Sequence, residues 1–273
     1  MMRSLWTGAS GMSAQQMSLD SIANNLANVN TTGYKRERLE FKTLLYQTMA
    51  RADMDPANTP ARPVNLQVGL GVRAAATSKI FDGGNFETTG NALDFAIEGN
   101  GFFVVRENND EYAYTKDGSF KVSNSDLGLI IVTADGFPLM DTNMQEIVIP
   151  DGVLPKAISV DSYGALSYMN ADGEAVDLGI QMAVTQFTNP QGLLASGKNL
   201  LKPTVSSGEA IMEEGLDAFM RSNVVQGVIE MSNVQVAEEM VKMIVAQRAY
   251  DLNSKVIQTS DDMLQQAANL KRN

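Results

Sequence analysis

The two ends of this 273-residue chain are patterned differently from its middle, and this contrast most constrains the fold. Near the N-terminus, apolar side chains recur at intervals of three, four and seven residues: Leu5, Met12, Leu19, Ile22 and Leu26. Side chains at these intervals share one face of an α-helix. The spacing predicts a helix that begins near residue 4 and ends in the Asn- and Thr-rich stretch 28–33, where polar side chains compete for backbone hydrogen bonds.

A longer series near the C-terminus steps by three or four residues: Val234, Ala237, Val241, Val245, Ala249, Leu252, Val256, Thr259 and Met263. It predicts a second helix from about residue 232 to 270. Neither helix would be stable alone in water, because most helical stability comes from burying such a stripe. We therefore expect both stripes to form an assembly interface that joins the two ends to each other and to neighbouring copies.

The middle of the chain reads as strand and turn. Short apolar runs at 95–97 and 102–105 flank the turn 98–101, and Asp-Gly turn signals follow at 117, 135, 151 and 172. Such spacing is typical of an all-β domain. The class predicted is α+β.

An extended segment is expected between the first helix and this β region. Residues 34–49 favour either a short helix or an extended arm, and residues 53–63 carry Pro56, Pro60 and Pro63, which specify irregular chain. The domains expected are a terminal-helix core at 1–32 and 232–273, a connecting segment at 33–75 and 226–231, and a β-rich domain at 76–225.

Composition excludes several functions. The chain has no Cys and no His, which removes disulfides, thiolate chemistry, the commonest metal ligand and the usual general base. Residues 76–225 carry 8 basic and 21 acidic side chains, which argues against nucleic acid as a partner. The sequence has no run of eighteen apolar residues for a membrane span, and its N-terminus lacks the apolar region of a secretory signal.

Other patterns could mark a site, and each has a simpler interpretation. Gly-x-Gly at 69–71 and 99–101 resembles part of a phosphate loop, but neither follows a strand and opens a helix. The acidic turns 108–111 and 170–174 lack the twelve-residue calcium pattern. The basic cluster at 35–42 is interrupted by Glu37 and Glu40, which favours a solvated face or a salt-bridged contact. We predict no catalytic residue, cofactor or metal.

Several segments resemble a known family. Ala23–Arg36 is similar to the N-terminal signature of bacterial flagellar rod and hook proteins, Gly90–Val104 and Tyr114–Phe120 to their central β motifs, and Ser232–Met240 and Gln247–Lys255 to their C-terminal signature. The likeness covers nearly the whole chain. Hook members are usually longer because of an additional outer domain, for which this chain has no room.

One more segment resembles an addition typical of the distal rod members of this family. It is carried by Tyr46, Pro56, Pro60, Pro63, Gly69, Gly71 and Arg73. The resemblance therefore implies a structural subunit of the distal rod, which transmits torque from motor to hook and encloses the export channel. The alternatives are a proximal rod or hook-type subunit of the same family and, from other classes, a secreted β-rich adhesin or a carboxylate-dependent glycosidase.

The resemblance also implies an architecture and partners. The terminal helices would form an antiparallel coiled coil in a helical homopolymer, with the β domain outside. The partners implied are other copies of the chain, proximal rod proteins, the hook protein, the surrounding P- and L-ring proteins and the flagellar type III export apparatus. The location implied is the periplasmic rod of the basal body, reached without a cleaved signal peptide.

Overall fold

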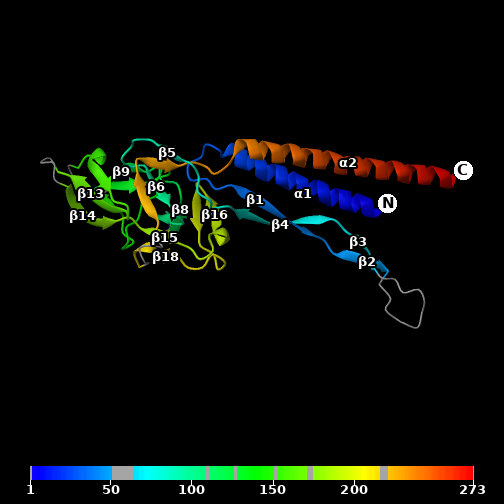
Figure 1. Ribbon diagram of the computed structural model, residues 1–273, viewed down its shortest axis with the longest axis horizontal. Helices are drawn as coiled ribbons and strands as arrows, with labels where there is room; N and C mark the ends of the chain where they lie inside the picture. The colour runs from blue at the N-terminus through cyan, green and yellow to red at the C-terminus, as the bar shows by residue number, and fades with distance from the viewer. Residues whose placement is uncertain are drawn as a thin grey trace, which may run out of the picture. The chain divides into compact units, whose positions relative to one another are not determined.

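The computed structural model describes residues 2–50, 64–107, 111–125, 128–150, 153–170, 175–215 and 221–272. The chain divides into two compact units (Figure 1). The helical unit comprises residues 1–27, 37–78 and 235–273, and the β unit comprises 28–36 and 79–234. The predicted α+β class, with helices at both ends and a β-rich middle, is confirmed.

Two long helices lie side by side in the helical unit, α1 (Met2–Ala27) and α2 (Val236–Arg272) (Figure 1). The first helix follows the prediction within two residues at its start. The second begins about four residues later than expected, because residues 231–234 are hydrogen-bonded within the β unit. Of the helices that the structure describes, none is long and apolar enough to cross a membrane.

The segment after the first helix is an extended arm and not a short helix. In the arm β1 (Glu37–Thr43) pairs with β4 (Val72–Lys79), and β2 (Tyr46–Ala50) pairs antiparallel with β3 (Leu66–Gly69). Most arm side chains are exposed or half-buried, since a two-stranded ribbon has no core of its own.

The largest described sheet of the β unit has six strands in the order β16-β17-β8-β7-β15-β18. Its strands are β7 (Phe102–Arg106), β8 (Tyr112–Thr115), β15 (Val184–Gln186), β16 (Leu194–Gly197), β17 (Leu200–Lys202) and β18 (Ile211–Met212). Two three-stranded sheets contain β9 (Lys121–Ser125), β10 (Gly128–Val132) and β11 (Val148–Ile149), and β12 (Ile158–Val160), β13 (Ala165–Met169) and β14 (Ala175–Gln181). The paired ribbons are β6 (Phe95–Glu98) with β19 (Asn223–Gln226), and β5 (Phe86–Thr88) with β20 (Val228–Glu230).

The β unit has the dense core that the arm lacks. Phe103 packs edge-to-face on Phe120, with ring centroids 5.2 Å apart, and Phe120 also contacts Phe95. Around these rings lie fully buried aliphatic side chains such as Ile131 and Leu139. The two apolar runs predicted as strands, 95–97 and 102–105, are therefore β6 and β7 of this core.

Candidate assembly interface

The contact between α1 and α2 is built largely from small and polar residues, with Ile257 as its apolar member on α2. Four contacts define this helix seam, and they run in opposite directions along the two helices. Ser4 Oγ lies 3.0 Å from Ser260 Oγ, and Asn25 Nδ2 donates to Glu239 Oε2 at 3.2 Å. Between them, a Cβ added to Gly8 would lie 3.0 Å from Ile257, and one added to Gly11 2.9 Å from Asn253. Glycines let the helices approach closely.

Asn25 connects the seam to the arm. It is buried, and its side-chain amide exchanges two 2.8 Å hydrogen bonds with the backbone of Glu37, donating to the carbonyl oxygen and accepting from the N–H. The same side chain donates to Glu239, a buried carboxylate that also pairs with Lys242 at 2.6 Å. Asn25 thereby ties the end of α1 to α2 and to the first residue of the arm.

Hydrophobicity alone did not identify the seam. Three of its contact positions on α2, Glu239, Asn253 and Ser260, are spaced by multiples of seven residues and are charged or polar, and the fourth, Ile257, is apolar. A search for small residues at helical spacing would have found Ser4, Gly8 and Gly11 on α1.

The apolar positions predicted on α1 lie at or beside the seam. Ile22 is buried, whereas the other four are half-buried: Leu5, Met12, Leu19 and Leu26. Trp6, the only tryptophan of the chain, is 74% exposed on the same helix.

The apolar positions predicted on α2 lie away from the seam and are 44–63% exposed: Val241, Val245, Leu252, Val256 and Met263. We call these five residues the outer stripe. By the helical step of about 100° per residue, they fall within a sector of about 60° of the helix surface. Large apolar side chains so exposed on one face of a helix are typical of a protein contact site.

The arm has a glycine-dependent geometry at two predicted positions. Tyr46 stands directly opposite Gly69, and a Cβ added there would lie 3.3 Å from the Tyr46 ring, so the ring covers the glycine. Gly71 has φ +115°, and a Cβ added there would lie 2.2 Å from Ser10 Oγ of α1. Arg73 is exposed. The three predicted prolines at 56, 60 and 63 lie outside the described residues.

The arm also presents apolar side chains to solvent. Those exposed around β2 and β3 are Leu45, Tyr46, Met49, Val64 and Leu66. The ribbon is too thin to bury them itself, so it offers a second apolar surface for contact with another molecule.

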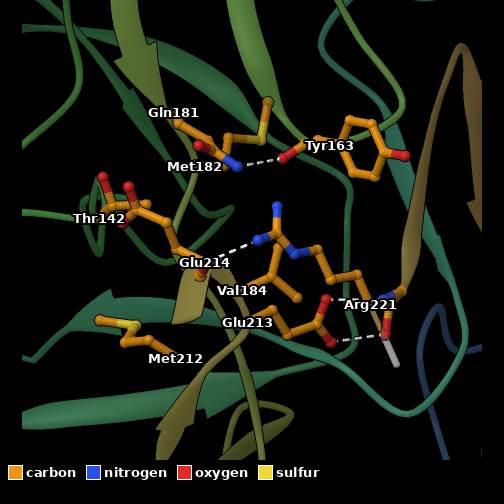
Figure 2. Close-up of a pocket in the computed structure, with 10 residues that line it drawn as sticks. Thr142, Tyr163, Gln181, Met182, Val184, Met212, Glu213, Glu214 and Arg221 are labelled. Carbon is orange, nitrogen blue, oxygen red and sulfur yellow. Dashed lines mark hydrogen bonds between the residues drawn. The ribbon is translucent and has the colours of Figure 1, made fainter. Parts of the chain in front are cut away.

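The β unit contains a hollow beside a buried carboxylate (Figure 2). Arg221 lies over the Tyr163 ring at 5.9 Å and donates to the carbonyl oxygen of Glu214 at 2.6 Å. Glu213 accepts hydrogen bonds from both the N–H and the hydroxyl of Ser222 at 2.7 Å. The hollow has room for about one water molecule. Its carboxylate is engaged in holding neighbouring chain segments together.

The other sequence patterns have structural explanations where they are described. Lys35, from the basic cluster at 35–42, is buried in an ion pair with Glu230. For this residue, the predicted salt-bridged contact is confirmed and the solvated face is not. The turn 99–101 approaches Ser222, whose hydroxyl accepts from the Gly101 N–H at 2.9 Å. Within the described part of the chain, no group of three or more acidic, His or Cys side chains is arranged to hold a metal ion.

Comparisons with known proteins match three family models. Residues 5–35 match "Flagella basal body rod protein", residues 96–168 match "Flagellar hook protein FlgE/F/G D1 domain", and residues 225–270 match "Flagellar basal body rod FlgEFG protein C-terminal". The matched regions are the first helix, the central β motifs and the last helix.

Curated relatives align over the full length. The chain is 47% identical over 278 residues to the flagellar basal-body rod protein FlgG of Borreliella burgdorferi, with all of both chains covered. It is 38% identical over 272 residues to FlgG of Bacillus subtilis, again over all of both chains. The flagellar hook-basal body complex protein FlhP of the same bacterium is 33% identical, with 97% of each chain covered.

Proposed function

We propose that this chain, which belongs to the FlgG family of flagellar basal-body rod proteins and is a structural rod subunit of the flagellum, forms the distal rod. It polymerises helically through its terminal helices. In the polymer α1 and α2 form an antiparallel coiled coil around the export channel. The polymer is a straight shaft that transmits torque to the hook. The function is structural and not enzymatic.

The outer stripe of α2 is the observation that carries this proposal. Most seam residues of α2 are small or polar, and the five large apolar side chains of the outer stripe are left exposed in the isolated chain. Burying them is worth about 1.5–3 kcal/mol for each fully covered side chain. A repeated, non-closing contact at this surface would generate a filament. The assembly role of the apolar residues predicted on α1 and α2 is part of this proposal.

We assign residues 46–73 of the arm a bracing role between neighbouring subunits. Its exposed apolar side chains around β2 and β3 give it contact surface, and Gly71 seats it against α1. The domain scheme proposed remains a helical core at 1–32 and 232–273, a connecting segment at 33–75 and 226–231, and an outer domain at 76–225.

The proposed partners follow from the rod's position. They are other copies of this chain, proximal rod proteins and the hook protein at the two ends, P- and L-ring proteins around the shaft, and the type III export apparatus that delivers the chain to the periplasm without a cleaved signal peptide. Outward placement of residues 76–225 is supported by their 21 acidic against 8 basic side chains, which would repel one another if crowded on the axis.

Trp6 provides the test of helix-driven assembly. It is the only tryptophan and is 74% exposed, so its fluorescence reports on α1 alone. Concentrating the full-length chain until it polymerises should shift the emission to shorter wavelength, because the proposed contacts would cover Trp6. Polymers formed with an unchanged Trp6 spectrum would contradict assembly through the helices. A map of the polymer with residues 76–225 on the channel wall would contradict the radial order.

A further inference from the structure

The two segments that connect the β unit to the rest of the chain lie against each other. The Gly33 N–H donates to the Glu230 carbonyl oxygen at 2.8 Å, and the Arg36 N–H donates to Asn233 Oδ1 at 2.8 Å. Asn233 Nδ2 in turn donates to the Ile80 carbonyl oxygen at 2.9 Å. Residues 33–36 and 230–233 are therefore neighbours, although Lys35 and Glu230 are 195 positions apart in sequence.

A buried ion pair joins the two segments. Lys35 Nζ lies 2.6 Å from Glu230 Oε1, and the two side chains are only 4% and 2% exposed. Lys35 Nζ also donates to the Asp82 carbonyl oxygen, and Glu230 Oε1 accepts from the Gly84 N–H, both at 2.8 Å. Of these two charged groups, the Asp82 carbonyl oxygen suits only the cation and the Gly84 N–H only the anion. These two backbone groups therefore determine that the lysine lies on segment 33–36 and the glutamate on segment 230–233.

The pair is a costly way to stabilise a fold. Removing two charges from water can cost more than their attraction returns, and well-packed apolar residues often do as well. The cost is increased here because Glu230 Oε2 is buried without a hydrogen-bond partner in the described structure. A second buried cation, Lys116, stands near enough for its charge to interact with both partners. Stability alone does not explain this arrangement.

We propose that the Lys35–Glu230 pair is a register lock, which selects a single alignment of segment 33–36 against segment 230–233. A slip of one residue would bring Tyr34 or the larger, planar Arg36 guanidinium to the buried site. It would also move Gly33 from a place that only glycine fits, where φ is +68° and an added Cβ would lie 2.5 Å from the Asp117 backbone nitrogen. An apolar pair would resist such a slip less, because hydrophobic contact is non-directional.

The test compares three variants of the full-length chain by unfolding and by amide hydrogen exchange. Lys35→Met strands the Glu230 charge and should lower the folded-to-unfolded ratio of the β unit by about 100-fold or more. Lys35→Met/Glu230→Met should recover most of that loss. In the double variant the Gly33 amide should nevertheless show more than one NMR signal, or exchange about tenfold faster or more, while the core amide of Val104 keeps its protection.

The matched control is Arg38→Met/Glu40→Met, which removes an ion pair of 3.6 Å whose side chains are 65% and 46% exposed. It should change neither measurement. A double variant with one Gly33 signal and native protection would overturn the register lock, because packing alone would then set the alignment. A stable Lys35→Met variant, or a double variant that cannot fold, would also overturn it, because each contradicts the energetic argument.

Discussion

Replacing Leu252 with Asp separates assembly from folding. Leu252 lies in the middle of the outer stripe and is 63% exposed in the single chain. Its loss should therefore change folding stability only slightly, by about 0.5–1 kcal/mol, much of it from the poorer helix propensity of Asp. The polymer should suffer far more, because the proposed contact would cover this side chain.

The magnitude follows from the exposed fraction. Full burial of a leucine is worth about 1.5–3 kcal/mol, and about two thirds of that, or about 1–2 kcal/mol, is still unused in the single chain. A carboxylate in its place loses this gain and must also be desolvated, which costs at least the about 1–3 kcal/mol of a neutral polar group on protein scales. A total of at least about 3 kcal/mol corresponds to a critical concentration for polymerisation raised by about 100-fold or more.

Sedimentation of polymer across a concentration series measures this value, and circular dichroism of the soluble fraction checks folding. The matched control is Gln258→Asp, which places the same charge at another exposed position of α2, outside the stripe. It should change the critical concentration by no more than about threefold. If Leu252→Asp polymerises at the native concentration, the outer stripe is not the assembly surface.

Three other changes test the β unit and the arm. Gly33→Ala should destabilise the β unit by at least about 2 kcal/mol in denaturant unfolding, because the left-handed conformation and the Asp117 backbone both oppose a Cβ. The control Gly83→Ala, with open space around the added Cβ, should be nearly neutral. Burial lowers the pKa of Lys116 from 10.5 to about 8. Below about pH 8 the folded state carries the full penalty of about 3 kcal/mol for holding the charged ammonium, so the free energy of unfolding should rise as the pH increases from about 8 toward 10. Lys116→Met should remove this rise in unfolding curves measured at each pH. Deleting residues 52–65 should leave a chain that still assembles into a more flexible or curved polymer, and straight rods of native stiffness by electron microscopy would show that the segment is a tolerated loop.

Local pattern in the sequence was enough for the class and the order of the elements. The two helices, the extended chain between them and the β-rich middle follow from periodicity and turn residues, which depend on neighbours within a few positions. The start of α2 was misplaced because residues 231–234 look helical locally but are held by Asn85, Ile80 and Asp82, about 150 positions away.

Which face of α2 meets α1 was decided only by the tertiary structure. Two stripes on α2 have helical spacing, an apolar one through Leu252 and a small, polar one through Asn253, and hydrophobicity favours the first. The chain pairs through the second because the glycines of α1 let the backbones approach, and it leaves the first exposed. The Lys35–Glu230 pair was equally hidden, because a contact between residues 195 positions apart leaves no local signal in the sequence.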